Sequence, residues 1–242
     1  MKVADEMDAL LARKRLLESP SCQDADFLAR LRELRIWQSA RLAKTYQDFH
    51  GDPRYSPALE FFLSDLYGPR EFADRNRNLA RAIRYLKRAL PAALIKVLAQ
   101  ALELDVLTRE LDHAMVRALA AAPVSAATYT AAYSSVDHRA SRARQIDLIV
   151  SVGEDLSRIV SRAWIGRLLH AAHMPAHAAG FGILQDFLER GHAAFLQMQD
   201  PERLLNAIQE RETEFMTSML RRKALDPSTQ SMLSTVGKPP RR

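Results

Sequence analysis

The sequence predicts an all-α protein: a single compact bundle of roughly eight or nine helices over residues 1–223, followed by a disordered basic tail over residues 224–242. Three observations support this fold class. The three commonest residues, Ala, Leu and Arg, are strong helix formers, and only 8 of the 242 residues are glycine. No segment alternates β-branched or aromatic residues with polar ones, as a strand would. Apolar residues make up 48% and charged residues 26%, which is typical of a folded globular chain.

Two helices are predicted at the start of the chain. The first covers residues 3–17 and ends before Ser19-Pro20-Ser21. The second begins near Asp24 or Asp26 and continues to Phe49, where Gly51 and Pro53 stop it. Its apolar residues recur at helical spacing, at Phe27, Leu31, Leu34, Trp37, Ala40 and Ala43.

Turn residues then mark the boundaries of a short helix. Ser56 is predicted to be its N-cap, with Pro57 at the first helical position. Tyr67-Gly68-Pro69 ends it, because glycine adopts the left-handed conformation just past a helix end and proline cannot continue the helix. The remaining helices are expected over residues 79–90, 92–121, 125–135, 137–172, 175–198 and 201–223. Pro91 breaks or kinks the chain between the first two of these, and Pro175 and Pro201 open the last two.

The cellular compartment is predicted from cysteine usage and hydropathy. Cys22 is the only cysteine, so an internal disulfide is impossible and a reducing environment fits. Asp5, Glu6 and Asp8 lie where a signal peptide would need basic and apolar residues. No run of about 18 apolar residues is present, so no membrane span is expected. We therefore expect a cytoplasmic protein.

The net charge of +6 is concentrated at the end of the chain. Residues 221–242 contain six basic residues and one acidic residue, so they carry +5 of the +6. The body of the protein is close to neutral, which weakens the case that overall basicity reflects binding to nucleic acid.

Two stretches resemble a known family. Tyr55-Ser56-Pro57, Phe61-Phe62-Leu63, Asp65-Leu66-Tyr67-Gly68-Pro69 and Phe72 form the first stretch, and residues 184–191 form the second. Together they resemble an uncharacterised group of bacterial all-helical proteins with a Phe-Phe-Leu-x-Asp-Leu-Tyr-Gly block. The resemblance implies an all-helical fold and a bacterial origin, and it implies no activity, cofactor or partner.

Asp65 and Tyr67 are candidate ligand-binding residues within that block. Asp65 follows Phe61 and Phe62 at helical spacing, so it shares the face that those rings would bury. A buried carboxylate needs a partner. It either lines a pocket with a raised pKa or, as we favour, joins two helices as a structural group.

Arg77, Arg81, Arg84 and Arg88 share another helix face, at spacings of four, three and four. Such a face could bind phosphates or an acidic partner, because guanidinium groups match the geometry of phosphate oxygens. The alternative is an ordinary solvated outer face. Aromatic residues for stacking on nucleic-acid bases are missing from it, which counts against nucleic acid.

A metal site is a further hypothesis. Glu110 with His113, and Glu189 with His192, both have the Glu-x-x-His spacing that di-metal carboxylate bundles use. Glu60 (or Asp65) and Glu154 occur in the chain order that such a site requires. Gly191 interrupts the second motif, however, and these spacings arise readily by chance in a helical chain rich in Glu.

His170, His173 and His177 form another histidine group, around Pro175. Three imidazoles could bind zinc, but the helix break predicted at Pro175 separates His177 from the others. We therefore interpret the group as a polar joint between helices. Nucleophilic catalysis finds little support, because no Gly-x-Ser-x-Gly motif is present and Cys22 has no patterned histidine partner.

The sequence therefore leaves several functions open. The favoured one is a non-catalytic regulatory or scaffolding protein that binds a partner protein or an anionic small molecule, with the Arg77–Arg88 face as its binding site. The first alternative is a di-metal oxidoreductase, and the second is nucleic-acid binding through the arginine face and the tail. A homodimer through an apolar helix face is also compatible with the pattern.

Overall fold

A computed structural model describes residues 2–19, 21–63, 83 and 91–221 of the chain. In these residues all regular secondary structure is helical, so the predicted all-α fold is confirmed. The helices are α1 (Lys2–Leu17), α2 (Ala25–Thr45), α3 (Gln47–His50), α4 (Ser56–Phe61), α6 (Ala92–Leu119), α7 (Ala126–Val136), α8 (Arg139–Val160), α9 (Ala163–Ala178), α10 (Gly182–Leu196) and α11 (Pro201–Leu220). The predicted helix over 79–90 and the tail over 224–242 lie outside the described residues, apart from Ile83, so the division at residue 223 stays a prediction.

Three helix starts follow the capping residues in the sequence. The Asp24 carboxylate accepts a hydrogen bond from the Phe27 amide at 2.8 Å, and Asp200 caps α11 in the same way. Ser125 and Thr128 form a reciprocal capping box at α7. Ser56, by contrast, is not an N-cap: α4 begins at Ser56 itself and has no side-chain cap.

Three predicted helix boundaries are wrong. The second helix stops at Tyr46, and α3 begins anew after it. The long helix predicted over 137–172 is interrupted at Ser161 and Arg162, where the chain turns so that α9 packs against α10. Pro175 does not break the chain but lies within the last turn and a half of α9, where it removes only one helical hydrogen bond.

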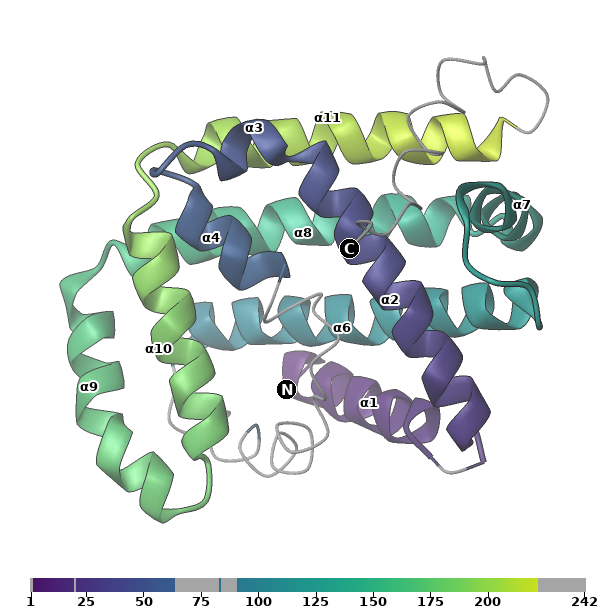
Figure 1. Cartoon of the computed structure of the whole chain (residues 1–242). Helices are drawn as coiled ribbons and strands as arrows, with labels where there is room; N and C mark the ends of the chain where they lie inside the picture. The colour runs from purple at the N-terminus through teal and green to yellow at the C-terminus, as the bar shows by residue number, and fades with distance from the viewer. Residues whose placement is uncertain (1, 20, 64–82, 84–90, 222–242) are drawn as a thin grey trace, which may run out of the picture.

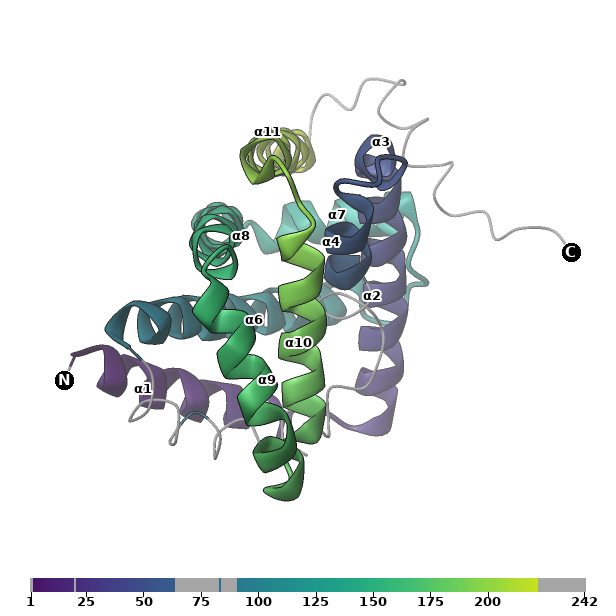
Figure 2. The same ribbon diagram turned by 90° about the vertical axis from the view of Figure 1, so that its left-hand side faces the viewer.

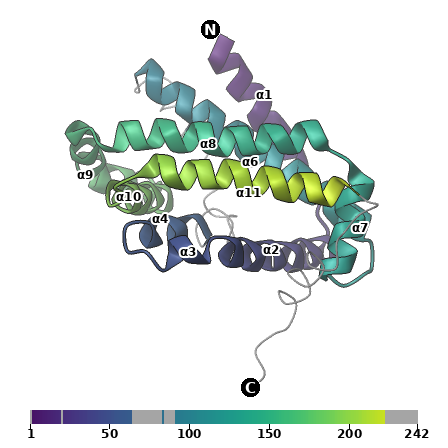
Figure 3. The ribbon, with the colours of Figure 1, turned by 90° about the horizontal axis from the view of Figure 1, so that it is seen from above.

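The helices form a layer that is covered on one face and closed at both ends. Helices α6, α8 and α11 stack side by side, with α1 packed against α6 (Figure 1). Helix α2 crosses one face of this layer in Figure 1, and the view from above shows it to one side of α8 and α11 (Figure 3). Helix α7 closes one end, and the α9–α10 hairpin closes the opposite end, where it faces the viewer in Figure 2.

The interior contains two large apolar clusters. The first lies at the α7 end and consists of Leu31, Leu34, Trp37, Met115, Val116, Leu119, Tyr129, Ala132, Tyr133 and Met219. The second lies toward α3, α4 and the start of α11 and consists of Leu42, Tyr46, Phe49, Tyr55, Ala58, Leu59, Met198, Leu204, Leu205 and Ile208. Both draw on residues far apart in sequence, so neither forms until α2 and α11 are in place.

A buried ionic network attaches α1 to α6. Lys14 binds Asp105 at 2.5 Å, and Arg109 binds both Asp105 and Glu18 at 3.1 Å. Burial alone would raise the pKa of Asp105, but Arg109 and Lys14 outweigh it and hold the pKa at about 2. The carboxylate therefore stays charged and compensates the buried cations.

The two stretches that carry the family resemblance meet in space. The Phe61 ring from the first stretch packs on Phe187 from the second, with ring centroids 5.0 Å apart. A Cβ added at Gly191 would lie 2.9 Å from the Phe61 ring, so a larger residue at this position would have to displace that ring. The resemblance therefore marks the contact between α4 and α10.

Hydropathy along the helices agrees with the sequence prediction. Among the described residues, none of the helices has the length and apolar character that a membrane span requires.

Candidate functional site

The anion-binding residues predicted from the sequence are not in the described part of the chain. Arg77, Arg81, Arg84, Arg88, Asp65 and Tyr67 all lie in the segments outside it. The arginine face and its neighbouring carboxylate therefore stay predictions.

The structure does not bring together the residues of the di-metal hypothesis. Glu110 forms a bidentate pair with Arg13 at the surface, while His113 is buried against Phe27. Both residues lie in the half of α6 that leads to α7, whereas Glu189 and His192 belong to α10, and the figures show α7 and α10 at opposite ends of the bundle (Figures 1 and 3). Glu60 and Glu154 are both exposed. Among the described residues, none of these six belongs to a group of three or more His, Cys, Asp or Glu side chains close enough to share a metal ion.

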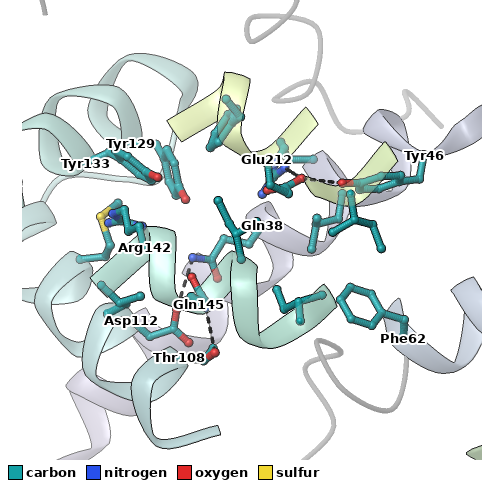
Figure 4. Close-up of a pocket in the computed structure, with 18 residues that line it drawn as sticks. Gln38, Tyr46, Phe62, Thr108, Asp112, Tyr129, Tyr133, Arg142, Gln145 and Glu212 are labelled. Atoms are coloured by element: carbon teal, nitrogen blue, oxygen red, sulfur yellow. Dashed lines mark hydrogen bonds and ion pairs between the residues drawn. The ribbon is translucent and has the colours of Figure 1, made fainter. Parts of the chain in front are cut away.

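A polar cavity lies between the two apolar clusters. Its volume is about 70 Å³, and helices α2, α6, α7, α8 and α11 all contribute to its wall. In Figure 4, Tyr129, Tyr133 and Arg142 are at one end, Tyr46 and Glu212 are toward the other, and Gln38 is between them. The lining residues are Gln38, Arg41, Leu42, Tyr46, Phe62, Thr108, Leu111, Asp112, Met115, Tyr129, Tyr133, Arg142, Gln145, Ile146, Ile149, Ile208, Glu212 and Phe215.

Arg142 is the unusual residue in this wall. It lies in the first turn of α8, is only 6% exposed, and places its guanidinium carbon 3.4 Å from the centre of the Tyr133 ring. Its Nε and Nη2 atoms are buried and have no hydrogen-bond partner among the residues that the structure describes. Buried donors are nearly always satisfied, because an unmade hydrogen bond costs about 1–3 kcal/mol.

Nε and Nη2 form the edge of a guanidinium that binds a carboxylate with two parallel hydrogen bonds. The neighbouring Arg144 shows this geometry on the protein surface, where its Nε and Nη2 donate to the two Glu103 oxygens at 2.9 and 2.8 Å. Arg54 binds Asp52 through the same edge. In Arg142 that edge is instead buried at the cavity, without a carboxylate from the described chain.

The other charged groups of the wall are already compensated. Arg41 donates to Glu212 at 2.6 Å, and the Tyr46 hydroxyl donates to the same oxygen at 3.0 Å. Asp112 accepts hydrogen bonds from Arg35 and Gln38. Burial opposes the charge on Arg41, but Glu212 outweighs this effect and raises the pKa of Arg41. Among the residues that the structure describes, the cavity therefore carries one uncompensated positive charge, on Arg142.

Neutral polar groups complete the lining near Arg142. Burial raises the pKa of both Tyr129 and Tyr133, so their hydroxyls remain protonated and can donate hydrogen bonds. The Gln145 amide donates to the Thr108 hydroxyl at 2.8 Å, one turn along α8 from Arg142. A guanidinium surrounded by neutral donors is an arrangement that binds an anion.

The helical period of α8 indicates that Arg142 is buried, although Arg142 was not among the binding residues predicted from the sequence. Arg142, Ile146 and Ile149 recur at spacings of four and three, so Arg142 continues the inward stripe of α8. Arg139 and Arg144 flank it, and the three arginines together read as an ordinary charged helix start. Position within the helical period, rather than residue type, distinguishes the buried arginine from the exposed ones.

The fold and the cavity define a class: an all-helical protein with a small interior cavity that charged and apolar side chains line. Residues 18–226 match the family described as Domain of unknown function (DUF8198), and the chain belongs to that family. No curated protein and no solved structure matches the chain.

Proposed function

We propose that this protein binds a small organic carboxylate in the cavity and acts as a non-catalytic, regulatory ligand-binding protein. The observation that carries the proposal is the buried Nε and Nη2 edge of Arg142, which has no partner among the described residues. A ligand carboxylate at this edge would make two charge-assisted hydrogen bonds and neutralise the buried charge.

Charge and size narrow the class of ligand. A monocarboxylate balances the single uncompensated charge, whereas phosphate carries about −1.5 to −2 and would bring excess negative charge beside Asp112 and Glu212. A volume of about 70 Å³ holds about five to seven water molecules at roughly 10–15 Å³ each. The ligand is therefore a short acid, and Leu111, Met115 and Ile146 offer apolar contacts to its carbon atoms.

The other functions predicted from the sequence have less support. A di-metal enzyme would need Glu110 and His113 beside Glu189 and His192, which lie at opposite ends of the bundle. Binding of a partner protein, anion or nucleic acid at the Arg77–Arg88 face stays a prediction, as do the homodimer, the bacterial origin and the cytoplasmic location.

Thermal unfolding with a panel of acids tests the proposal. Acetate, pyruvate and butyrate are compared with their neutral amides and with inorganic phosphate. A binding acid at 100 times its Kd stabilises the fold by about 2.7 kcal/mol, which raises the Tm by roughly 5–10 °C in a chain of this size. The amides and phosphate are expected to have little effect, and calorimetric titration then gives the Kd of the best acid.

Two matched variants locate the binding site. Arg142→Met removes the guanidinium but keeps an unbranched apolar side chain, and Arg144→Met removes an exposed arginine of the same helix. Arg142→Met is expected to abolish the response to acids and to leave the ligand-free protein about 1–2 kcal/mol more stable, because a buried unsatisfied charge is gone. Arg144→Met should respond like the wild type. A response that survives in Arg142→Met, or one that no acid produces in the wild type, would exclude the proposal.

A further inference from the structure

The α9–α10 hairpin gathers nitrogen and oxygen donors outside the cavity. His173 and His177 lie one turn apart on α9, and Asp186 lies on α10. One ring nitrogen from each histidine and one Asp186 oxygen all lie within 4.8 Å of one another. The helix break that the sequence predicts at Pro175 would separate His177 from His173, but α9 continues through Pro175 to Ala178 and keeps both imidazoles on one face.

Two glycines permit this arrangement. Gly180 adopts a φ of 80°, which closes the turn between the helices and is strained for any other residue. Gly182 lies directly beside the His177 ring, where an added Cβ would come within 2.5 Å of Nδ1. The His177 ring can therefore take this position only because Gly182 has no side chain.

The hydrogen bonds prepare the histidines for coordination. His177 Nε2 lies 2.9 Å from Asp186 Oδ1, and His173 Nδ1 lies 2.9 Å from Glu189 Oε1. When His173 donates its Nδ1 proton to Glu189, its Nε2 keeps a free lone pair, which is the usual second-shell arrangement of a metal-binding histidine. Glu189 is itself held by the Gln185 amide at 2.8 Å, and Gln185 is only 5% exposed.

We propose that His173, His177 and Asp186 form a binding site for a divalent transition-metal ion, with zinc as the preferred ion. Two imidazoles and a carboxylate suit zinc, which commonly takes three protein ligands and a water molecule. Ligand atoms about 2.0–2.1 Å from a tetrahedral ion are roughly 3.3 Å apart, so the 2.9 Å between His177 and Asp186 needs only a small adjustment. All three side chains are partly exposed, which gives an ion access from solvent.

The competing interpretation is a pair of ion pairs that join the two helices without a metal. Surface ion pairs are worth only about 0–1 kcal/mol and need no buried support. Here the buried Gln185 donates both to Glu189 and to the Leu169 carbonyl at 2.8 Å. That fixed orientation of Glu189 is what a second-shell carboxylate requires.

Calorimetric titration of the chelator-treated full chain with zinc chloride tests the site, with native mass spectrometry to count ions. The wild type is expected to bind one zinc ion per chain with a micromolar or tighter Kd. Glu189→Gln should weaken binding by about 10–100-fold, as loss of a second-shell partner does, and His177→Ala should weaken it further. Gly182→Ala should also weaken binding, although it removes no ligand, because its methyl group displaces the His177 ring.

His170→Ala is the matched control, since His170 is an exposed histidine on the same helix that the donor group does not include. It should bind zinc as the wild type does, and circular dichroism confirms that each variant is folded. The site is overturned if the wild type binds no zinc, if His177→Ala and Asp186→Asn bind it unchanged, or if His170→Ala loses it. Arg142→Met should bind zinc normally, so this result is independent of the proposed carboxylate site.

Discussion

At the scale of single residues, the buried Lys and Arg side chains fall into two groups: those that pair with a carboxylate of the chain, and Arg142, which is the candidate binding residue. Lys14 and Arg109 share Asp105, and Arg41 binds Glu212, so each of these three buried cations pairs with a carboxylate of the chain. Arg142 stacks on Tyr133 instead and leaves two donors without a partner in the described residues. A cation–π contact compensates part of the lost hydration, up to about 2 kcal/mol, but it does not satisfy the N–H groups.

His113 is a buried group whose charge state should govern acid stability. It is 2% exposed, its Nε2 accepts a hydrogen bond from the Gln23 amide, and burial together with Arg117 lowers its pKa to about 4. Between about pH 4 and about pH 6.5, the His113 imidazole is protonated in the unfolded chain, where its pKa is near 6.5, but stays neutral in the folded chain. The free energy of unfolding should therefore fall by about 3 kcal/mol as the pH decreases from about 6.5 to about 4.

Urea unfolding at several pH values measures this dependence. His113→Met removes the titrating group and should flatten the pH dependence in that window, while the exposed His170→Ala should keep the wild-type slope. An unchanged slope in His113→Met would assign the acid sensitivity to another group.

At the scale of elements, a glycine in α8 governs how closely that helix packs against α11. Gly153 faces Leu205, and a Cβ added at Gly153 would overlap the Leu205 side chain. Leu205 belongs to the second apolar cluster and is buried, so it has little room to adjust. Because position 153 has no side chain, α8 and α11, two of the helices that line the cavity, can pack closely.

Gly153→Ala is therefore expected to destabilise the fold by about 1–3 kcal/mol through overpacking, even though alanine favours helix by about 1 kcal/mol. Gly51→Ala is the matched comparison. Gly51 has a φ of −75°, and its nearest neighbours would be at ordinary contact distances, so that substitution should be neutral or slightly stabilising. Chemical denaturation measures the free energy of unfolding of both variants. Equal changes would show that the α8–α11 contact accommodates a methyl group at position 153 without cost.

At the scale of the whole molecule, the cavity lies at the junction of the two apolar clusters. Tyr129, Tyr133 and Met115 belong to the first cluster, and Leu42 and Ile208 belong to the second. A ligand there would contact helices from both clusters at once. The proposed zinc site lies instead within a hairpin at one end of the bundle (Figure 2).

Hydrogen exchange should separate the two sites. A binding carboxylate is expected to slow exchange in α2, α7, α8 and α11, because it stabilises the junction that they share, and to leave α9 and α10 nearly unchanged. Zinc should protect α9 and α10 selectively. Exchange followed by mass spectrometry resolves these segments, and protection of the hairpin alone by carboxylate would contradict the cavity as its binding site.

Local chemistry made much of the fold predictable. The predicted helix starts near Asp24, Ser125 and Pro201 depend on short-range features, since the side chains of Asp24, Ser125 and Asp200 cap these helices, whereas the cap predicted at Ser56 is wrong. The break at Ser161 has no glycine or proline to mark it, and it is set by the packing of α9 on α10. The helix break predicted at Pro175 is wrong, because one missing hydrogen bond near a helix end costs little when tertiary contacts stabilise the helix.

The sequence by itself determined the helical class, because residue propensities and apolar periodicity act within a few turns of the chain. The tertiary structure alone decided which polar residues meet. Glu110 and Glu189 have the same motif spacing but lie on separate helices, α6 and α10, whereas His177 and Asp186 lie 2.9 Å apart across a turn that the sequence predicted at Pro175 instead. The period of α8 places Arg142 on the inward face, but the cavity beside it is lined by residues of five helices, which no local pattern brings together.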